Sequence, residues 1–102
     1  PDIAKWGGFT ECSKLIKNIV QNKITYCPHY LGGGIGLVES AHLLSASDDK
    51  GILEVDINDN PLRSDIVGDI FEKNSGFATL SDIPGLGFEP NLKAISKYLV
   101  AH

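Results

Sequence analysis

The side chain best suited to chemistry is His29, which stands between a short β-prone run at residues 24–27 and a turn with four glycines at residues 32–36. A histidine at the carboxyl end of a strand in an α/β protein is well placed to move a proton, because imidazole changes its charge near neutral pH. The glycines let the backbone pass closely around whatever the ring faces. The pattern therefore predicts a proton-transfer residue.

Asp2 and Glu54 are the carboxylates that we expect to share a site with His29. Each stands on a short apolar run followed by a turn, as His29 does. Neighbouring strands lie about 5 Å apart, so Asp2 can reach the imidazole and Glu54 can flank it from the other side. A carboxylate on one ring nitrogen would fix the tautomer and leave the other nitrogen to move a proton. The structural alternatives are a lone hydrogen-bonded histidine, a strand-start cap at Asp2, and an ion pair of Glu54 with Arg63 or Lys5.

Three other motifs do not support a site. The glycine run lacks the G-x-G-x-x-G spacing of a dinucleotide-binding turn. The segment that begins at Asp56 opens like a calcium loop, but Pro61 and Val67 stand where the glycine and the bidentate glutamate are required. Glu39 and His42 have the Glu-x-x-His spacing of di-iron bundles, yet a single copy on an α/β helix cannot build that centre. We therefore interpret His42 as a helix-surface or packing residue.

The elements that must position these residues alternate as strand, helix, strand, helix, strand, which predicts an α/β fold with parallel strands and right-handed crossovers. The clearest helix has Thr10 as its N-cap and ends at residues 22–23, because apolar residues recur on one face at helical spacing. That face comprises Cys12, Leu15, Ile16, Ile19 and Val20. We expect strands over 2–6, 24–27 and 52–57, a second helix over 37–46, a loop at 58–61, a hairpin over 70–80, and a final helix capped by Asn91 that buries Leu92, Ile95 and Leu99.

The composition excludes several classes of function. The 102 residues carry a formal net charge of −4, which gives no electrostatic reason to expect nucleic acid or an anionic membrane as a partner. No apolar run approaches membrane-spanning length. Cys12 and Cys27 lack the spacing of a zinc or disulfide site, so we expect free thiols and a cytoplasmic protein. The chain has no methionine and starts in a strand-like run, so we expect it to be the end of a longer polypeptide.

Five segments, taken in order, resemble the mandelate racemase branch of the enolase superfamily: residues 1–10, Pro28-His29, residues 40–44, Leu53-Glu54 and residues 83–87. The resemblance covers residues 1–102 and implies the last three βα units and the C-terminal tail of a TIM-type (β/α) barrel. It implies that His29 and Asp2 form the dyad that moves the proton next to a carboxylate, and that Glu54 hydrogen-bonds the enolate-like intermediate. Asp2 stands where muconate-lactonising and dipeptide-epimerising enzymes carry a lysine, which disfavours those activities.

The resemblance also implies partners outside this chain. The family's Mg²⁺ ligands lie on the third to fifth strands and its lysine motif on the second, so the metal ligands would lie outside this chain and the chain alone is expected to be inactive. The expected parent is a lyase (an acid-sugar dehydratase) or an isomerase (a racemase) that acts on a small carboxylate, a sugar acid. It would include the rest of the barrel and a capping domain, as a homo-oligomer. The alternative is a non-catalytic α/β fragment or interaction module that needs another chain to complete the barrel.

Overall fold

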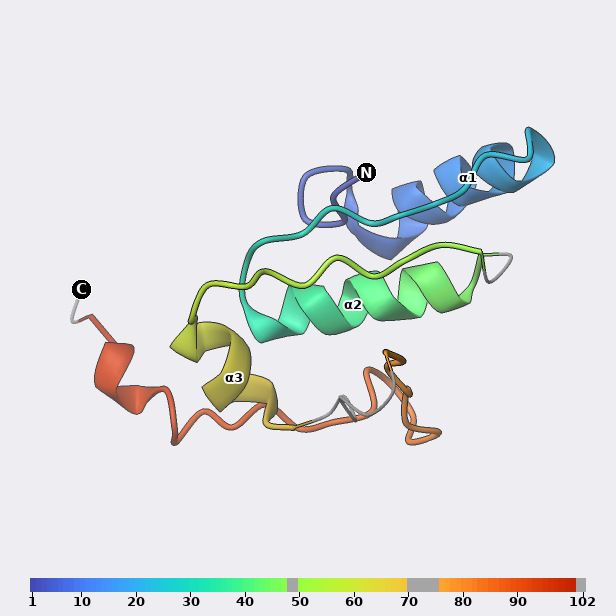
Figure 1. Ribbon diagram of the computed structural model, residues 1–102. Coiled ribbons are helices and arrows are strands. Elements are labelled where there is room, and N and C mark those ends of the chain that lie inside the picture. The colour runs from blue at the N-terminus through green and yellow to red at the C-terminus, as the bar shows by residue number, and fades with distance from the viewer. Residues whose placement is uncertain (48–49, 70–75, 101–102) are drawn as a thin grey trace.

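A computed structural model describes residues 1–47, 50–69 and 76–100. Its helices are α1 (Gly8–Gln21), α2 (Gly34–Ser45) and α3 (Pro61–Val67), followed by the short 3₁₀ helix η1 (Ser96–Tyr98). Helix α2 contacts both α1 and α3 and therefore occupies the middle of the molecule (Figure 1). Within the described ranges, no helix is both long enough and apolar enough to cross a membrane.

Two extended segments run between the helices where strands were predicted. In Figure 1, residues 24–30 and 50–57 lie side by side and run in the same direction, as parallel strands would. The Ile52 N–H donates to the Cys27 Sγ at 3.4 Å, and Gly51 lies so close to the Tyr26 carbonyl that a Cβ there would have no room. Although their direction agrees with an α/β chain, no strand ladder is formed in the part of the chain that the structure describes. The number of βα units therefore stays a prediction.

The predicted strand over residues 2–6 is wrong, because the chain turns immediately after Asp2. The amides of Lys5 and Trp6 both donate to the Asp2 carbonyl at 3.1 Å. The Asp2 side chain reinforces this turn, since its Oδ1 accepts a hydrogen bond from the Ala4 amide at 2.9 Å. An aspartate that bonds the backbone two residues ahead favours a turn over an extended strand.

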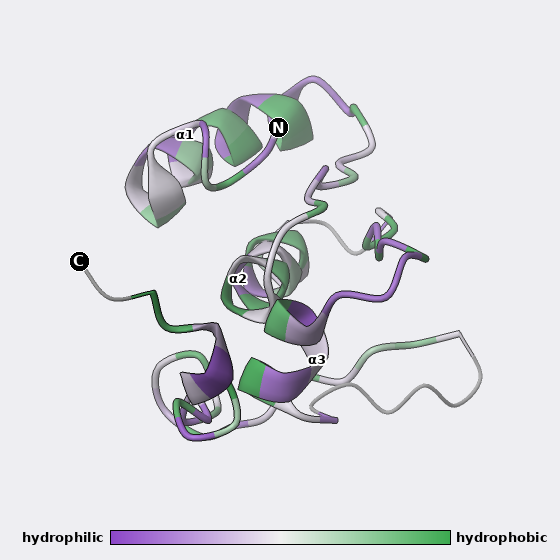
Figure 2. Cartoon of the chain, turned by 90° about the vertical axis from the view of Figure 1, so that its left-hand side faces the viewer, coloured by the Kyte–Doolittle hydropathy of each residue, from purple (hydrophilic) through white to green (hydrophobic). Residues whose placement is uncertain are grey.

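Helix α1 has the predicted apolar face, of which Cys12 and Ile16 are buried. The prediction of Thr10 as the N-cap is wrong, since the helix already begins at Gly8 and Gly7 occupies the cap with a φ of 86°. Glycine reaches that left-handed conformation without the steric cost that a side chain would add. The predicted end at residues 22–23 is confirmed, because Asn22 is the C-cap. Figure 2 shows hydrophobic and hydrophilic residues alternating along α1. The core that α1 helps to form consists of Ile3, Cys12, Ile16, Tyr26 and Leu43.

Helix α2 begins at Gly34, inside the glycine run, rather than at residue 37 as predicted. Gly34 permits a close approach of α3, because a Cβ at this position would lie within 3.0 Å of the Arg63 carbonyl oxygen. Helix α3 was not predicted, since the sequence indicated only a loop at residues 58–61. Asn60 starts it, since its Oδ1 accepts from the Leu62 amide at 3.0 Å, and Pro61 occupies the first helical position.

The C-terminal tail, residues 76–100, passes beside α2 and then α3 as mostly irregular backbone. The Asn91 amide donates to the Ile66 carbonyl at 2.8 Å, which ties the tail to α3. The predicted final helix is wrong: Asn91 caps a single turn, and Leu92 and Leu99, expected to be buried, are 67% and 80% exposed. Of the predicted hairpin over 70–80, residues 70–75 lie outside the described residues, and residues 77–80 form no strand.

Candidate functional site

His29 lies at the end of the extended segment 24–30, with its ring turned toward solvent. The residue before it, Pro28, is fully buried, whereas the His29 side chain is 58% exposed. This alternation is what an extended backbone imposes, since successive side chains point to opposite faces. The His29 amide donates to the Pro1 carbonyl at 3.4 Å, which holds this end of the segment against the start of the chain.

The carboxylate that contacts His29 is Glu54. Its Oε2 lies 2.6 Å from the His29 Nδ1, and the two residues are 25 positions apart. Cys27 and Ile52, which bond to each other two positions earlier on the two segments, are also 25 apart. Both pairs therefore have the same register, which sets His29 beside Glu54. With Nδ1 donating to the carboxylate, the ring keeps Nε2 available as a proton acceptor.

The structural alternative for Glu54, an ion pair with Arg63 or Lys5, is wrong, because both cations contact other carboxylates. The Lys5 Nζ lies 3.0 Å from the Asp2 Oδ2, and the Arg63 Nη1 lies 3.8 Å from the Asp56 Oδ2. Both pairs join residues close in sequence.

Asp2 is buried and is held by local partners rather than by His29. Burial opposes ionisation of its carboxylate, but the hydrogen bond with Lys5 and the bond from the Ala4 amide outweigh this and lower the pKa of Asp2. Among the described residues, no hydrogen bond joins Asp2 to His29, so the two do not form the expected direct dyad. Lys5 was missed by the sequence reasoning as a partner of Asp2, although the Asp-x-x-Lys spacing could have suggested it.

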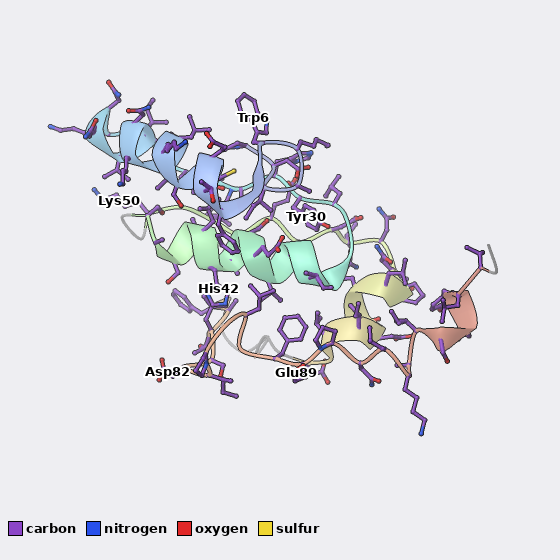
Figure 3. The ribbon with its side chains drawn as sticks, turned by 180° about the vertical axis from the view of Figure 1, so that it is seen from behind. Trp6, Tyr30, His42, Lys50, Asp82 and Glu89 are labelled. Atoms are coloured by element: carbon purple, nitrogen blue, oxygen red, sulfur yellow. The ribbon has the colours of Figure 1, made fainter. Side chains whose placement is uncertain are left out.

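His42 is a packing residue, as predicted. Its Nε2 lies 3.2 Å from the Leu86 carbonyl oxygen, so it joins α2 to the C-terminal tail. In Figure 3, Tyr30 lies near the start of α2, whereas His42 lies farther along this helix.

A cavity of about 300 Å³ is bounded by Lys23, Ile24, Thr25 and Lys50. It lies at the start of the extended segments, whereas His29 and Glu54 lie toward their ends.

The described residues do not fit a magnesium ion. Over residues 1–47, 50–69 and 76–100, no group of three His, Cys, Asp or Glu side chains lies close enough together to hold a metal. The Glu54 carboxylate is bonded to His29, and the Asp2 carboxylate to Lys5. What this arrangement offers chemically is therefore a solvent-accessible imidazole with an oriented carboxylate on one nitrogen.

Comparison with known proteins identifies a similar solved structure and two relatives that are similar in sequence. A 46% identical crystal structure, of a mandelate racemase/muconate lactonizing enzyme from Bordetella bronchiseptica, superposes with a TM-score of 0.82 over 97% of this chain. The chain is 27% identical to D-galactarolactone cycloisomerase of Agrobacterium fabrum, with 96% of its length matched. It is 31% identical to arabinonate dehydratase of Saccharolobus solfataricus, with 85% matched.

These relatives are much longer than the chain, which spans only 28%, 28% and 23% of their respective lengths. The names of these relatives describe a mandelate racemase/muconate lactonizing enzyme, a cycloisomerase and a dehydratase. The family model for Enolase C-terminal domain-like proteins matches residues 1–94. That match confirms the resemblance seen in the sequence and agrees with a TIM-barrel-type α/β fold. The chain belongs to the Enolase C-terminal domain-like family.

Proposed function

We propose that the protein containing this chain removes the proton next to the carboxylate of a sugar acid and then eliminates water. The observation that carries the proposal is the 2.6 Å contact between the His29 Nδ1 and the Glu54 Oε2, which joins the two extended segments. The names of two relatives, a dehydratase acting on arabinonate and a cycloisomerase acting on galactarolactone, support a sugar-acid substrate. We favour dehydration over racemisation because a dehydratase is among these relatives.

In the proposed reaction, His29 is the group that carries the proton. Its Nε2 takes the proton from the α-carbon, and the electron pair of the broken C–H bond moves into an enolate. Collapse of the enolate breaks the bond to the β-hydroxyl group, which takes the proton from the His29 imidazolium and leaves as water, so that the imidazole is neutral again. The Glu54 carboxylate favours the proton transfer to His29 because it stabilises the imidazolium that forms when the proton arrives.

Glu54 and Asp2 would have different roles at this site. We propose that Glu54 orients the imidazole as a carboxylate through its contact with Nδ1. The hydrogen bond to the enolate-like oxygen that the family resemblance implies requires a protonated Glu54, because an ionised carboxylate has no proton to donate. Lys5 stabilises Asp2 as an anion. The residue before Asp2, Pro1, accepts a hydrogen bond from the His29 amide through its carbonyl. We propose that the negative charge of Asp2 favours the protonated imidazole without a direct contact.

Magnesium, which the family resemblance implies, would be held by residues outside this chain. The described residues contain no cluster of three metal-ligating side chains. The rest of the barrel would supply those ligands and the remaining wall of the substrate site.

The test is α-proton exchange in D₂O, followed by ¹H NMR on the protein that contains this chain, with a panel of sugar acids. The variant His29→Asn should lower the exchange rate by roughly 10²–10⁴-fold, the typical contribution of a general base. His42→Asn is the matched control, because the His42 Nε2 contacts the Leu86 carbonyl and not Glu54, so this variant should leave exchange per folded protein unchanged. Full exchange in His29→Asn would remove His29 from the reaction.

A further inference from the structure

Tyr30, which directly follows His29, packs its ring against the glycine-rich turn at the start of α2 (Figure 3). A Cβ added at Gly36 would come closer than 3.0 Å to the Tyr30 Cζ and Oη, and a Cβ added at Gly32 would do the same. Real Cβ atoms do not approach other atoms so closely. The tyrosine ring therefore occupies a notch, formed by Gly32 and Gly36, that exists only because neither residue has a side chain.

The other side of the same turn is closed by α3 and the residue before it. The Asn60 Nδ2 donates to the Gly32 carbonyl at 3.4 Å. A Cβ at Gly34 would lie within 3.0 Å of the Arg63 carbonyl oxygen, so the backbones of α2 and α3 meet there. A run of glycines is flexible by itself. The turn after His29 is held in one conformation because Tyr30 fills one side and α3 closes the other.

His29 depends on this support because its own side chain has few contacts. The side chain is 58% exposed, and its Nδ1 contacts Glu54. Its position is therefore set mainly by its backbone, which is joined to the start of the chain by one bond to Pro1 and to the glycine turn through Tyr30. A rotation of Tyr30 out of the notch would free the turn and, through the shared peptide bond, the backbone of His29.

We propose that Tyr30 is a positioning residue: its ring, seated in the notch of Gly32 and Gly36, holds the imidazole of His29 beside Glu54. The proposal rests on the proposed function for its consequence in catalysis. It assigns the effect to the shape of the ring and not to the hydroxyl group. It also gives a reason for glycine at position 36, which lies inside a helix where alanine would otherwise be favoured.

The test is a set of variants in the protein that contains this chain: Tyr30→Phe, Tyr30→Ala, Gly36→Ala and the Tyr30→Ala/Gly36→Ala double variant. Tyr30→Phe keeps the ring and should keep kcat. Tyr30→Ala and Gly36→Ala should each lower kcat by up to about 100-fold with KM little changed, because small displacements of a catalytic group cost that much. The double variant should be no worse than either single variant, since both remove the same packing.

Stability measurements separate positioning from general damage to the fold. Alanine has the higher helix propensity, so Gly36→Ala added to Tyr30→Ala should raise the melting temperature without restoring kcat. Ile35→Ala is the matched control: it truncates an exposed large side chain in the same turn of α2 and should leave kcat unchanged. Losses that multiply in the double variant, or a Tyr30→Phe variant as poor as Tyr30→Ala, would overturn the proposal.

A crystal structure of Gly36→Ala tests the same idea without any activity. We expect the Tyr30 ring to leave the notch and the distance from the His29 Nδ1 to the Glu54 Oε2 to exceed hydrogen-bonding range. An intact His29–Glu54 contact with the ring displaced would refute the positioning role even if the enzyme is active. If the contact breaks but no sugar acid exchanges its α-proton in the unmodified protein, the positioning role stands and the proposed function fails.

Discussion

Replacing Glu54 with glutamine separates a catalytic role of this residue from a structural one. The substitution keeps the size of the side chain and a hydrogen-bonding oxygen beside the His29 Nδ1, but removes the negative charge. If Glu54 takes part in the reaction, turnover should fall strongly while the fold is hardly affected. If the contact is only a structural ion pair, stability should fall while turnover per folded protein is unchanged.

The exposure of the two side chains sets the expected size of each effect. The side chains of His29 and Glu54 are 58% and 43% exposed, so water screens the pair. Ion pairs as exposed as this contribute up to about 1 kcal/mol to the free energy of unfolding. Loss of one preformed electrostatic partner of a developing charge costs about 10²–10³-fold in kcat, roughly 3–4 kcal/mol. The catalytic loss should therefore exceed the loss of stability several-fold.

The assay combines α-proton exchange in D₂O with thermal unfolding of the same preparations. Asp56→Asn is the matched control, because Asp56 lies two residues from Glu54 on the same segment and pairs with Arg63 at 3.8 Å. The control should lower the melting temperature and leave the exchange rate per folded protein unchanged. A Glu54→Gln protein that is destabilised but exchanges at the full rate would refute the reasoning and remove Glu54 from the site.

The remaining predictions concern two buried polar groups, Tyr26 and Asp2. The Tyr26 hydroxyl is buried and has no hydrogen-bond partner in the part of the chain that the structure describes, so Tyr26→Phe should leave stability unchanged or raise it by up to about 1 kcal/mol; a loss of that size in urea unfolding would contradict this. Burial raises the pKa of Tyr26 to about 12, above the unfolded value of about 10, so stability should decline as pH rises from about 10 to 12, and Tyr26→Phe should lack this contribution to the decline. The pKa of Asp2 is lowered despite its burial, mainly by Lys5, so its contribution to stability is present above the unfolded value of about 3.9 and is lost as pH falls through the folded value. Asp2→Asn should therefore flatten the acid limb of stability measured by urea unfolding, and an unchanged limb would show that Asp2 is not held by Lys5.

The sequence by itself determined the features that depend on a local pattern of residues. The apolar face of α1 follows from residues at helical spacing, so its buried members Cys12 and Ile16 could be identified in advance. His29 and Glu54 could be named as candidate site residues because each stands on an apolar run before a turn. The order of the segments along the chain also sufficed to indicate the family, which the match over residues 1–94 confirms.

Only the tertiary structure decided which charged groups pair. Asp2 lies within reach of Lys5 three residues along the turn, and this pairing needs little ordering of the chain, so it prevails over the expected contact with His29. The contact between His29 and Glu54 depends instead on the register of two segments 25 residues apart, which no local pattern contains. The notch for Tyr30 likewise exists only in the folded chain, where Gly32 and Gly36 both lie against the tyrosine ring. A glycine in a sequence does not show which side chain will fill the space beside it.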